Sequence, residues 1–234
     1  SQAQKLKDLP ITSTVQAVQG VTYPALSKIA DDDTKFRYGY LRLMRILSFV
    51  VFPIMLGFVV IAPDMFMLLL GEKWMPTVPY FEILVLSGLF YPLAIVSYNV
   101  LKVKSDGKII VRLEIIKRVI MTAVLCYTIP QSVEAIAWGM TAMAAIEFAI
   151  NTSVAVKYIE RGASLLLRAI TPSLGVAMAM FAVLHLQCEL LCDLHIASRL
   201  GIMIITGAAI YLSLSWVLSL RALRECMQLL RNIA

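Results

Sequence analysis

The chain has 234 residues, of which 60% are apolar and only 15% are charged, and its mean hydropathy is +0.82. Soluble domains are roughly 45 to 50% apolar and about 25% charged, so this composition excludes an ordinary soluble protein. It predicts an all-α integral membrane protein. Lys and Arg outnumber Asp and Glu by 21 to 15, and four cysteines are too few for a disulfide framework.

Apolar runs long enough to cross a bilayer recur along the whole chain. A helix needs about 20 largely apolar residues to span the hydrocarbon layer. The first candidate, 3–27, has this length, although its Thr and Gln side chains must face protein or water. Six clearer runs follow, at 46–70, 80–101, 110–129, 133–156, 165–187 and 198–220. We therefore predict a bundle of about seven transmembrane helices within residues 1–234.

Two amphipathic segments flank these spans. The segment KFRYGYLRLMR at 35–45 and the tail RALRECMQLLRNIA at 221–234 carry basic residues on one side and apolar residues on the other. This pattern is typical of helices that lie in the membrane interface, where anionic lipid attracts the basic face. Within the spans, Pro53, Pro92 and Pro172 are expected to kink their helices.

Lys and Arg are concentrated in alternate connections between the spans. The positive-inside rule therefore predicts a cytoplasmic C-terminus. The opening SQAQKLKDLP has no initiator Met and no signal-peptide pattern, so we expect it to lie inside a longer chain. The opposite ends of the spans carry only Lys73 and Arg199, and Lys5 and Lys7 are exceptions to the bias. The residues at the basic ends are Lys28, Lys35, Arg37, Arg42, Arg45, Lys102, Lys104, Lys108, Arg112, Lys157, Arg161, Arg168, Arg221, Arg224 and Arg231.

The run LEIIKRVIMTAVLCYTIP at 113–130 places Glu114, Lys117 and Arg118 in the first turns of a spanning helix. One interpretation is that both cations extend back to the headgroups while Glu114 pairs with Arg118 at i, i+4. The other is that one of them faces a watered cavity and holds an anionic ligand, because adjacent helix residues point about 100° apart. Both interpretations stay open at this point.

Glu147 falls near the middle of the run 133–156, where a carboxylate is costly unless it is paired, protonated or in water. We expect it to face the bundle interior. No soluble-enzyme pattern is present: His185 and His195 are too isolated for a metal site, and no phosphate-cradling GxxxxGK[ST] loop occurs. The sequence thus predicts no enzyme activity, no metal, no cofactor and no nucleic-acid partner.

Several motifs carry a family resemblance: AQKLKDLP, VTYPALSKIADDD, FPIMLGFVVIAPDMFMLLLGEKWMPTVPYFEIL, YNVLKVKSDGK and LEIIKRV. Over roughly residues 1–120 the chain resembles the second half of a bacterial polysaccharide flippase of the Wzx type, in the multidrug/oligosaccharidyl-lipid/polysaccharide exporter superfamily. The resemblance implies one half of a fourteen-helix fold, with the missing N-terminal half as a partner. It also implies translocation of a polyprenyl-pyrophosphate-linked oligosaccharide for lipopolysaccharide or exopolysaccharide biosynthesis.

The resemblance also implies site residues. In the family a cation precedes a Pro in the cavity between the halves, and the matching residue is Lys5, with Pro10 downstream. We expect Lys5 and either Lys117 or Arg118 to meet the pyrophosphate during alternating access. Polar residues would line the sugar path, and Glu147 is the candidate for ion or proton coupling. The polar set comprises Gln16, Gln19, Tyr98 and Asn99.

Two other functions stay open. One is a small-molecule or drug exporter of the same superfamily, although the cations Lys5, Lys117 and Arg118 against Glu114 and Glu147 favour an anionic substrate. The other is a membrane scaffold that transports nothing and recruits a polysaccharide polymerase or glycosyltransferases. Membrane lipids are partners in every case.

Overall fold

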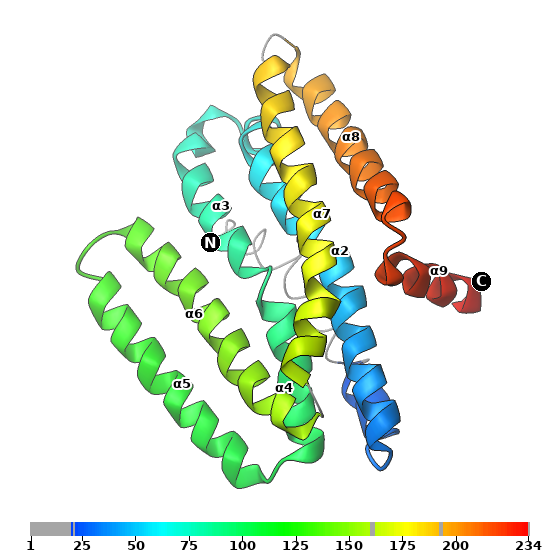
Figure 1. The fold of residues 1–234 in the computed structure, drawn as a ribbon. Helices are drawn as coiled ribbons and strands as arrows, with labels where there is room; N and C mark the ends of the chain where they lie inside the picture. The colour runs from blue at the N-terminus through cyan, green and yellow to red at the C-terminus, as the bar shows by residue number, and fades with distance from the viewer. Residues whose placement is uncertain (1–19, 21, 160–161, 192–193, 234) are drawn as a thin grey trace.

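The chain is built from helices that pack into one elongated bundle (Figure 1). The computed structural model describes residues 20, 22–159, 162–191 and 194–233, and this part of the chain contains no strand. The predicted all-α architecture is confirmed. The helices are α2 (Asp33–Leu69), α3 (Val78–Ser87), α4 (Tyr91–Lys104), α5 (Gly107–Thr128), α6 (Val133–Ala155), α7 (Gly162–Leu190), α8 (Ile196–Val217) and α9 (Arg221–Ile233), with short 3-10 helices at Glu72–Thr77 and Val156–Tyr158.

The longest helix, α2, begins at a side-chain cap. Asp32 accepts hydrogen bonds from the backbone N–H groups of Thr34 (3.1 Å) and Lys35 (3.0 Å), and these bonds lower the pKa of its carboxyl group. The 37 residues of α2 extend about 55 Å, which exceeds the hydrocarbon layer. The predicted interfacial helix at 35–45 is therefore wrong as a separate element. It is the first part of α2, and Phe36 and Tyr40 are buried against the bundle.

The predicted single span 80–101 is divided into α3 and α4. Three tight-turn hydrogen bonds, each from a backbone N–H to the carbonyl three residues earlier, carry the chain through Gly88, Leu89 and Phe90. Pro92 follows in the first turn of α4, where its missing N–H costs no helix bond. We expected Pro92 to kink a single helix, but it lies at the start of a separate one.

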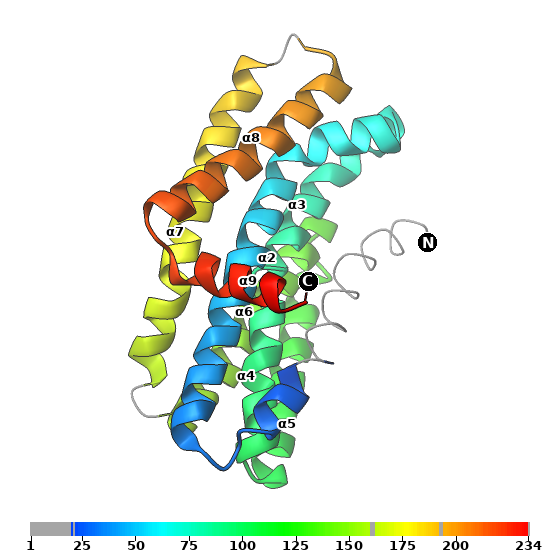
Figure 2. The same ribbon diagram turned by 90° about the vertical axis from the view of Figure 1, so that its right-hand side faces the viewer.

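Helix α2 is the central element. It packs against α7 and α8 on one side and against α3 and α4 on the other, while α6 covers α3 and α4. The hairpin of α5 and α6 and the hairpin of α7 and α8 stand at opposite edges of the bundle in Figure 1. Helix α9 turns away from the end of α8 and lies across α2, as the second view shows (Figure 2).

Within the described residues, five helical segments are long and apolar enough to span a membrane. This is two fewer than the predicted seven. The run 3–27 lies mostly outside the described residues, and α5 has spanning length but carries four charges between Arg112 and Arg118. Many apolar side chains on the helices are nevertheless exposed, as expected for a multi-pass membrane protein whose outer surface meets lipid. The five segments are Asp33–Leu69, Glu72–Lys104, Val133–Tyr158, Gly162–Leu190 and Ile196–Val217.

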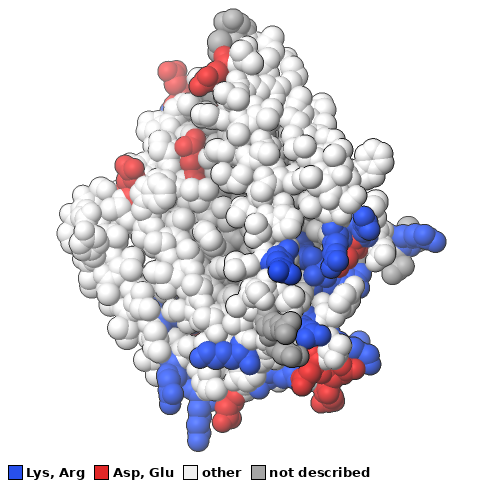
Figure 3. All heavy atoms as spheres, in the orientation of Figure 1, with Lys and Arg blue, Asp and Glu red and all other residues white. Residues whose placement is uncertain are grey.

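Lys and Arg side chains gather at one end of the bundle and around α9 (Figure 3). The start of α2, the α4–α5 connection and the start of α7 meet at this end in the ribbon view. The opposite end, formed by the end of α2 and the α7–α8 connection, shows mostly uncharged atoms with a few acidic residues. The charge asymmetry read from the sequence thus corresponds to two distinct ends of the molecule.

Gly139 permits close contact between α5 and α6. A Cβ atom there would lie 3.0 Å from methyl carbons of both Val124 and Thr128, whereas Gly175 on α7 has no heavy atom within 4 Å of such a position. We expect Gly139→Leu to destabilise the protein by about 1–3 kcal/mol through overpacking. Gly175→Leu is the matched control and should be tolerated. Thermal unfolding in detergent measures both, and an equal midpoint for the two variants would contradict the expectation.

Candidate functional site

Helix α5 turns a charged residue inward and its apolar residues outward. Lys117 is only 6% exposed, whereas Ile115 and Val119 are 59% and 63% exposed. Lys117 and Thr128 are the buried side chains of this helix. This arrangement is the reverse of that in a soluble protein, and it suits a helix with one face toward lipid and a polar group sheltered from it.

The ammonium group of Lys117 has two partners. It forms an ion pair and hydrogen bond with the carboxylate of Glu114, one turn earlier on α5. It also lies 4.9 Å from the centre of the Tyr98 ring, which α4 contributes. Lys102, one turn further along α4, lies 4.8 Å from the same ring centre. Both distances are within the range of cation–π attraction.

Arg118 occupies a different environment from its neighbour. Its side chain is exposed on α5, because a step of one residue rotates the side-chain direction by about 100°. One of the two interpretations of the sequence paired Glu114 with Arg118, whereas the structure pairs it with Lys117 at i, i+3. Of the two adjacent cations, therefore, Lys117 is the one that the bundle shelters.

Tyr98 and Asn99, which the sequence grouped as polar cavity residues, point to different neighbours. Tyr98 meets the two lysines, whereas Asn99 is 2% exposed and donates a 2.6 Å hydrogen bond to the Thr22 hydroxyl. Asn99 therefore links α4 to the helical segment that contains Thr22. The other predicted substrate-contacting residues, Lys5, Gln16 and Gln19, lie outside the described residues.

Glu147 lies on α6 with its side chain half-buried. Within the described ranges it forms no ion pair or hydrogen bond. One turn further along α6, Asn151 is buried and donates a 3.3 Å hydrogen bond to the Ala94 carbonyl on α4. Glu147 is thus an acidic group at the edge of the α4–α6 interface, separate from the cluster around Lys117.

Hydroxyl groups that sequence reasoning missed join three helices. The Ser97 hydroxyl on α4 lies 3.1 Å from the Tyr40 hydroxyl on α2 and 2.9 Å from the Thr152 hydroxyl on α6. Tyr40 and Ser97 are completely buried. Tyr40 lies in the basic stretch 35–45 and Ser97 stands directly before Tyr98 and Asn99, so no signal in the sequence brings the two together.

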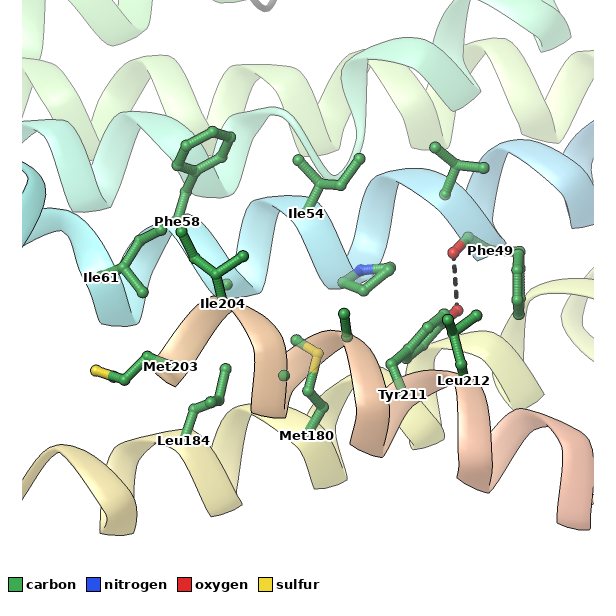
Figure 4. Close-up of a pocket in the computed structure, with 15 residues that line it drawn as sticks. Phe49, Ile54, Phe58, Ile61, Met180, Leu184, Met203, Ile204, Tyr211 and Leu212 are labelled. Carbon is green, nitrogen blue, oxygen red and sulfur yellow. Dashed lines mark hydrogen bonds between the residues drawn. The ribbon is translucent and has the colours of Figure 1, made fainter. Parts of the chain in front are cut away.

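A cavity in the described part of the chain contains none of the predicted site residues. It has a volume of about 470 Å³, lies between α2, α7 and α8, and has an apolar lining (Figure 4). One polar contact borders it, a 2.8 Å hydrogen bond from the Tyr211 hydroxyl to the Phe49 carbonyl. Side chains that line it include Ile54, Phe58, Met180, Leu184 and Met203.

Part of the amino-acid sequence is similar to known proteins. Residues 1–79 match the model of a family described as polysaccharide biosynthesis protein. An uncharacterised membrane protein in the cps region of Klebsiella pneumoniae is 34% identical over 108 residues, 46% of this chain and 22% of that protein. The first third of this chain is therefore similar to a family of polysaccharide biosynthesis proteins. The resemblance seen in the sequence motifs is thereby confirmed.

Two further relatives carry names from cell-surface polysaccharide synthesis. The lipopolysaccharide biosynthesis protein WzxC of Escherichia coli (strain K12) is 35% identical over 69 residues, 30% of this chain and 14% of that protein. The teichuronic acid biosynthesis protein TuaB of Bacillus subtilis (strain 168) is 26% identical over 87 residues, 37% of this chain and 18% of that protein. The matches thus cover about a fifth or less of the length of these relatives. No solved structure matches it.

Away from Lys117, two ion pairs connect α2 to α8 and to α9. Asp64 near the end of α2 accepts hydrogen bonds from the Arg199 guanidinium on α8, and Arg45 on α2 donates two to Glu225 on α9. Asp64 interrupts the apolar run FVVIAPDMFMLLL, so its burial could have been suspected from the sequence. In the part of the chain that the structure describes, no group of three or more His, Cys, Asp or Glu side chains could hold a metal.

Proposed function

We propose that this protein translocates a polyprenyl-diphosphate-linked oligosaccharide from the cytoplasmic to the outer leaflet of the bacterial inner membrane. The glycan would serve lipopolysaccharide or exopolysaccharide biosynthesis, and the protein would act as a transporter and not as an enzyme. The observation that carries the proposal is the sheltered Lys117 in a multi-pass helical bundle. Its relationship to proteins of lipopolysaccharide and teichuronic acid biosynthesis supports the same substrate class.

A lysine in this position suits a diphosphate headgroup. Lys117 is paired with a carboxylate on the same helix and not with a permanent partner from elsewhere in the described bundle. A buried ammonium group forms strong, charge-assisted hydrogen bonds with phosphate oxygens, since water competes weakly there. The lipid tail can stay in the bilayer while the charged head crosses beside such groups.

The transport cycle we propose is alternating access between two halves of the complete protein. This chain contributes one half, and the N-terminal half contributes the other wall of the cavity, into which Lys5 would project with Lys117. The basic end of the bundle would face the cytoplasm, together with α9 and the C-terminus. Glycosyltransferases would then supply the glycan on one side of the membrane, and a polysaccharide polymerase would consume it on the other.

Glu147 is the group we assign to coupling. A half-buried carboxylate without an ion-pair partner in the described residues can bind or release a proton or cation as the halves rock. Its position outside the lysine cluster keeps coupling and substrate charge apart. Glu147→Gln would then abolish any dependence of transport on the driving gradient while leaving substrate binding intact.

The test of the function is removal of the Lys117 charge. We expect Lys117→Gln to lower transport of a labelled lipid-linked oligosaccharide in reconstituted vesicles by roughly 10- to 100-fold, the effect of losing a hydrogen bond between charged groups. Lys108→Gln, at an exposed position at the start of α5, is the matched control and should transport nearly as wild type. Surface polysaccharide in a strain that depends on the protein provides the second readout.

Each rival function gives a different result in this test. A scaffold for glycan-assembly enzymes would leave surface polysaccharide intact in Lys117→Gln and lose it when the cytoplasmic connections are altered. An exporter of cationic drugs would move those compounds and fail to move the lipid-linked oligosaccharide. Either result would overturn the flippase proposal.

A further inference from the structure

Two lysines approach the same aromatic ring from different depths of the bundle. Lys102 is exposed, Tyr98 is partly buried and Lys117 is buried, so the three side chains form a path from the surface to the interior. The ammonium nitrogens lie 4.8 Å and 4.9 Å from the ring centre, so they can be no further apart than the sum of these distances. The two positive charges that meet at this ring equal in number the two negative charges of a diphosphate diester.

Glu114 occupies Lys117 in the structure. Its carboxylate is the counter-ion of the lysine, yet the Glu114 side chain is 35% exposed while that of Lys117 is 7% exposed. The carboxylate therefore holds the lysine from the more accessible side. A phosphate that reaches Lys117 must compete with it, because the ammonium group has only three donors and one of them already binds Glu114.

A second cation lies within reach of Glu114 on the same helix. Arg118 follows it at i, i+4, a spacing at which Glu and a basic residue can pair on a helix surface. Arg118 is exposed, and no salt bridge to it is present among the described residues. The carboxylate can therefore leave Lys117 for Arg118 by rotating about its own side-chain bonds, with no movement of the backbone.

We propose that Lys102 and Lys117 form a two-cation clamp for the diphosphate, and that Glu114 is an exchangeable counter-ion that releases Lys117 to the substrate and moves to Arg118. Tyr98 is the positioning residue of the clamp, since its ring aligns both ammonium groups without neutralising either. The headgroup meets Lys102 first and Lys117 second. This proposal rests on the proposed function, and it adds the exchange step and the second lysine to it.

The experiment measures binding of farnesyl diphosphate to the purified protein in nanodiscs by isothermal titration calorimetry. We expect Glu114→Gln to bind about 2- to 10-fold more tightly than wild type, because the competing carboxylate is gone. Lys102→Gln and Lys117→Gln should each bind at least about tenfold more weakly. A misfolded variant cannot bind more tightly, so the gain in Glu114→Gln separates charge exchange from damage to the fold.

Further variants serve as controls. Lys108→Gln removes an exposed lysine at the start of α5 and should leave the affinity unchanged. Tyr98→Phe keeps the aromatic face and should bind as wild type, whereas Tyr98→Leu keeps both lysines and should bind several-fold more weakly. Equal affinity of Tyr98→Leu and Tyr98→Phe would remove the positioning role from the ring.

The outcomes distinguish this proposal from the proposed function. If diphosphate binding depends on Lys117 but Glu114→Gln binds no more tightly than wild type, the exchange is wrong and the flippase proposal stands. If Lys102→Gln binds farnesyl diphosphate as tightly as wild type, the two-cation clamp is wrong and the flippase proposal again stands. If wild-type protein binds no farnesyl diphosphate, or binds it equally without Lys117, both proposals fail.

Discussion

Replacing Asp64 with Leu is expected to destabilise the protein by about 3–5 kcal/mol, the range for breaking a buried ion pair from one side. Asp64 is 4% exposed and Arg199 contacts it with two guanidinium nitrogens, Nε at 2.6 Å and one terminal nitrogen. Loss of the carboxylate removes this two-point contact between α2 and α8. Thermal unfolding in detergent, followed by the change in helicity, measures the loss.

A double substitution separates the contribution of the ion pair to stability from the cost of removing only one of its two charges. Asp64→Leu with Arg199→Met removes both charges and should recover most of the lost stability, because an apolar pair of similar volume often replaces a buried ion pair at no cost. Lys35→Met serves as the control at the exposed pair with Asp32. A double variant that is less stable than either single variant would contradict this account of the α2–α8 contact.

Glu225→Ala is expected to detach α9 from α2. The Arg45 guanidinium donates to both carboxylate oxygens of Glu225, at 3.1 Å and 2.6 Å, and both side chains are nearly buried. Such a two-point contact fixes orientation as well as distance. Breaking it leaves Arg45 unpaired inside the contact and should cost about 3 kcal/mol of docking free energy.

Cys226, the neighbour of Glu225, reports this detachment. Burial, and then the Glu225 carboxylate, raise the pKa of its thiol above the ordinary value. Undocking of α9 ends the burial and the substitution removes the carboxylate, so the pKa of the thiol falls and the reactive thiolate becomes more abundant at neutral pH. In a background without the other three cysteines, we expect maleimide to label Cys226 faster in Glu225→Ala than in wild type.

The charge-swapped variant Arg45→Glu/Glu225→Arg should restore slow labelling, since it keeps the pair with its polarity reversed. Arg224→Ala, at an exposed position on the same helix, should label as wild type. Equal labelling rates in Glu225→Ala and wild type would show that α9 is held by its apolar contacts alone.

The family of this protein was readable from short motifs, but its site was readable only in part. The run 113–130 predicted that a cation lies within a membrane bundle and left Lys117 and Arg118 as equal candidates. Packing of α5 against α4 and α6 decides between them, because only one direction on α5 meets Tyr98. Lys102 was grouped with the interfacial cations, since nothing in the sequence pairs it with residue 117.

Composition and hydropathy by themselves determined that the chain is helical and lies in a membrane, because an unpaired backbone is too costly in lipid for any open arrangement. They also determined which helix ends carry positive charge. Only the tertiary structure decided that α2 runs unbroken through 35–45, that the run 80–101 is two helices, and that Asp64 meets Arg199. The physical reason is that lipid and protein interior are equally apolar, so hydropathy finds a helix without telling which of its faces meets another helix.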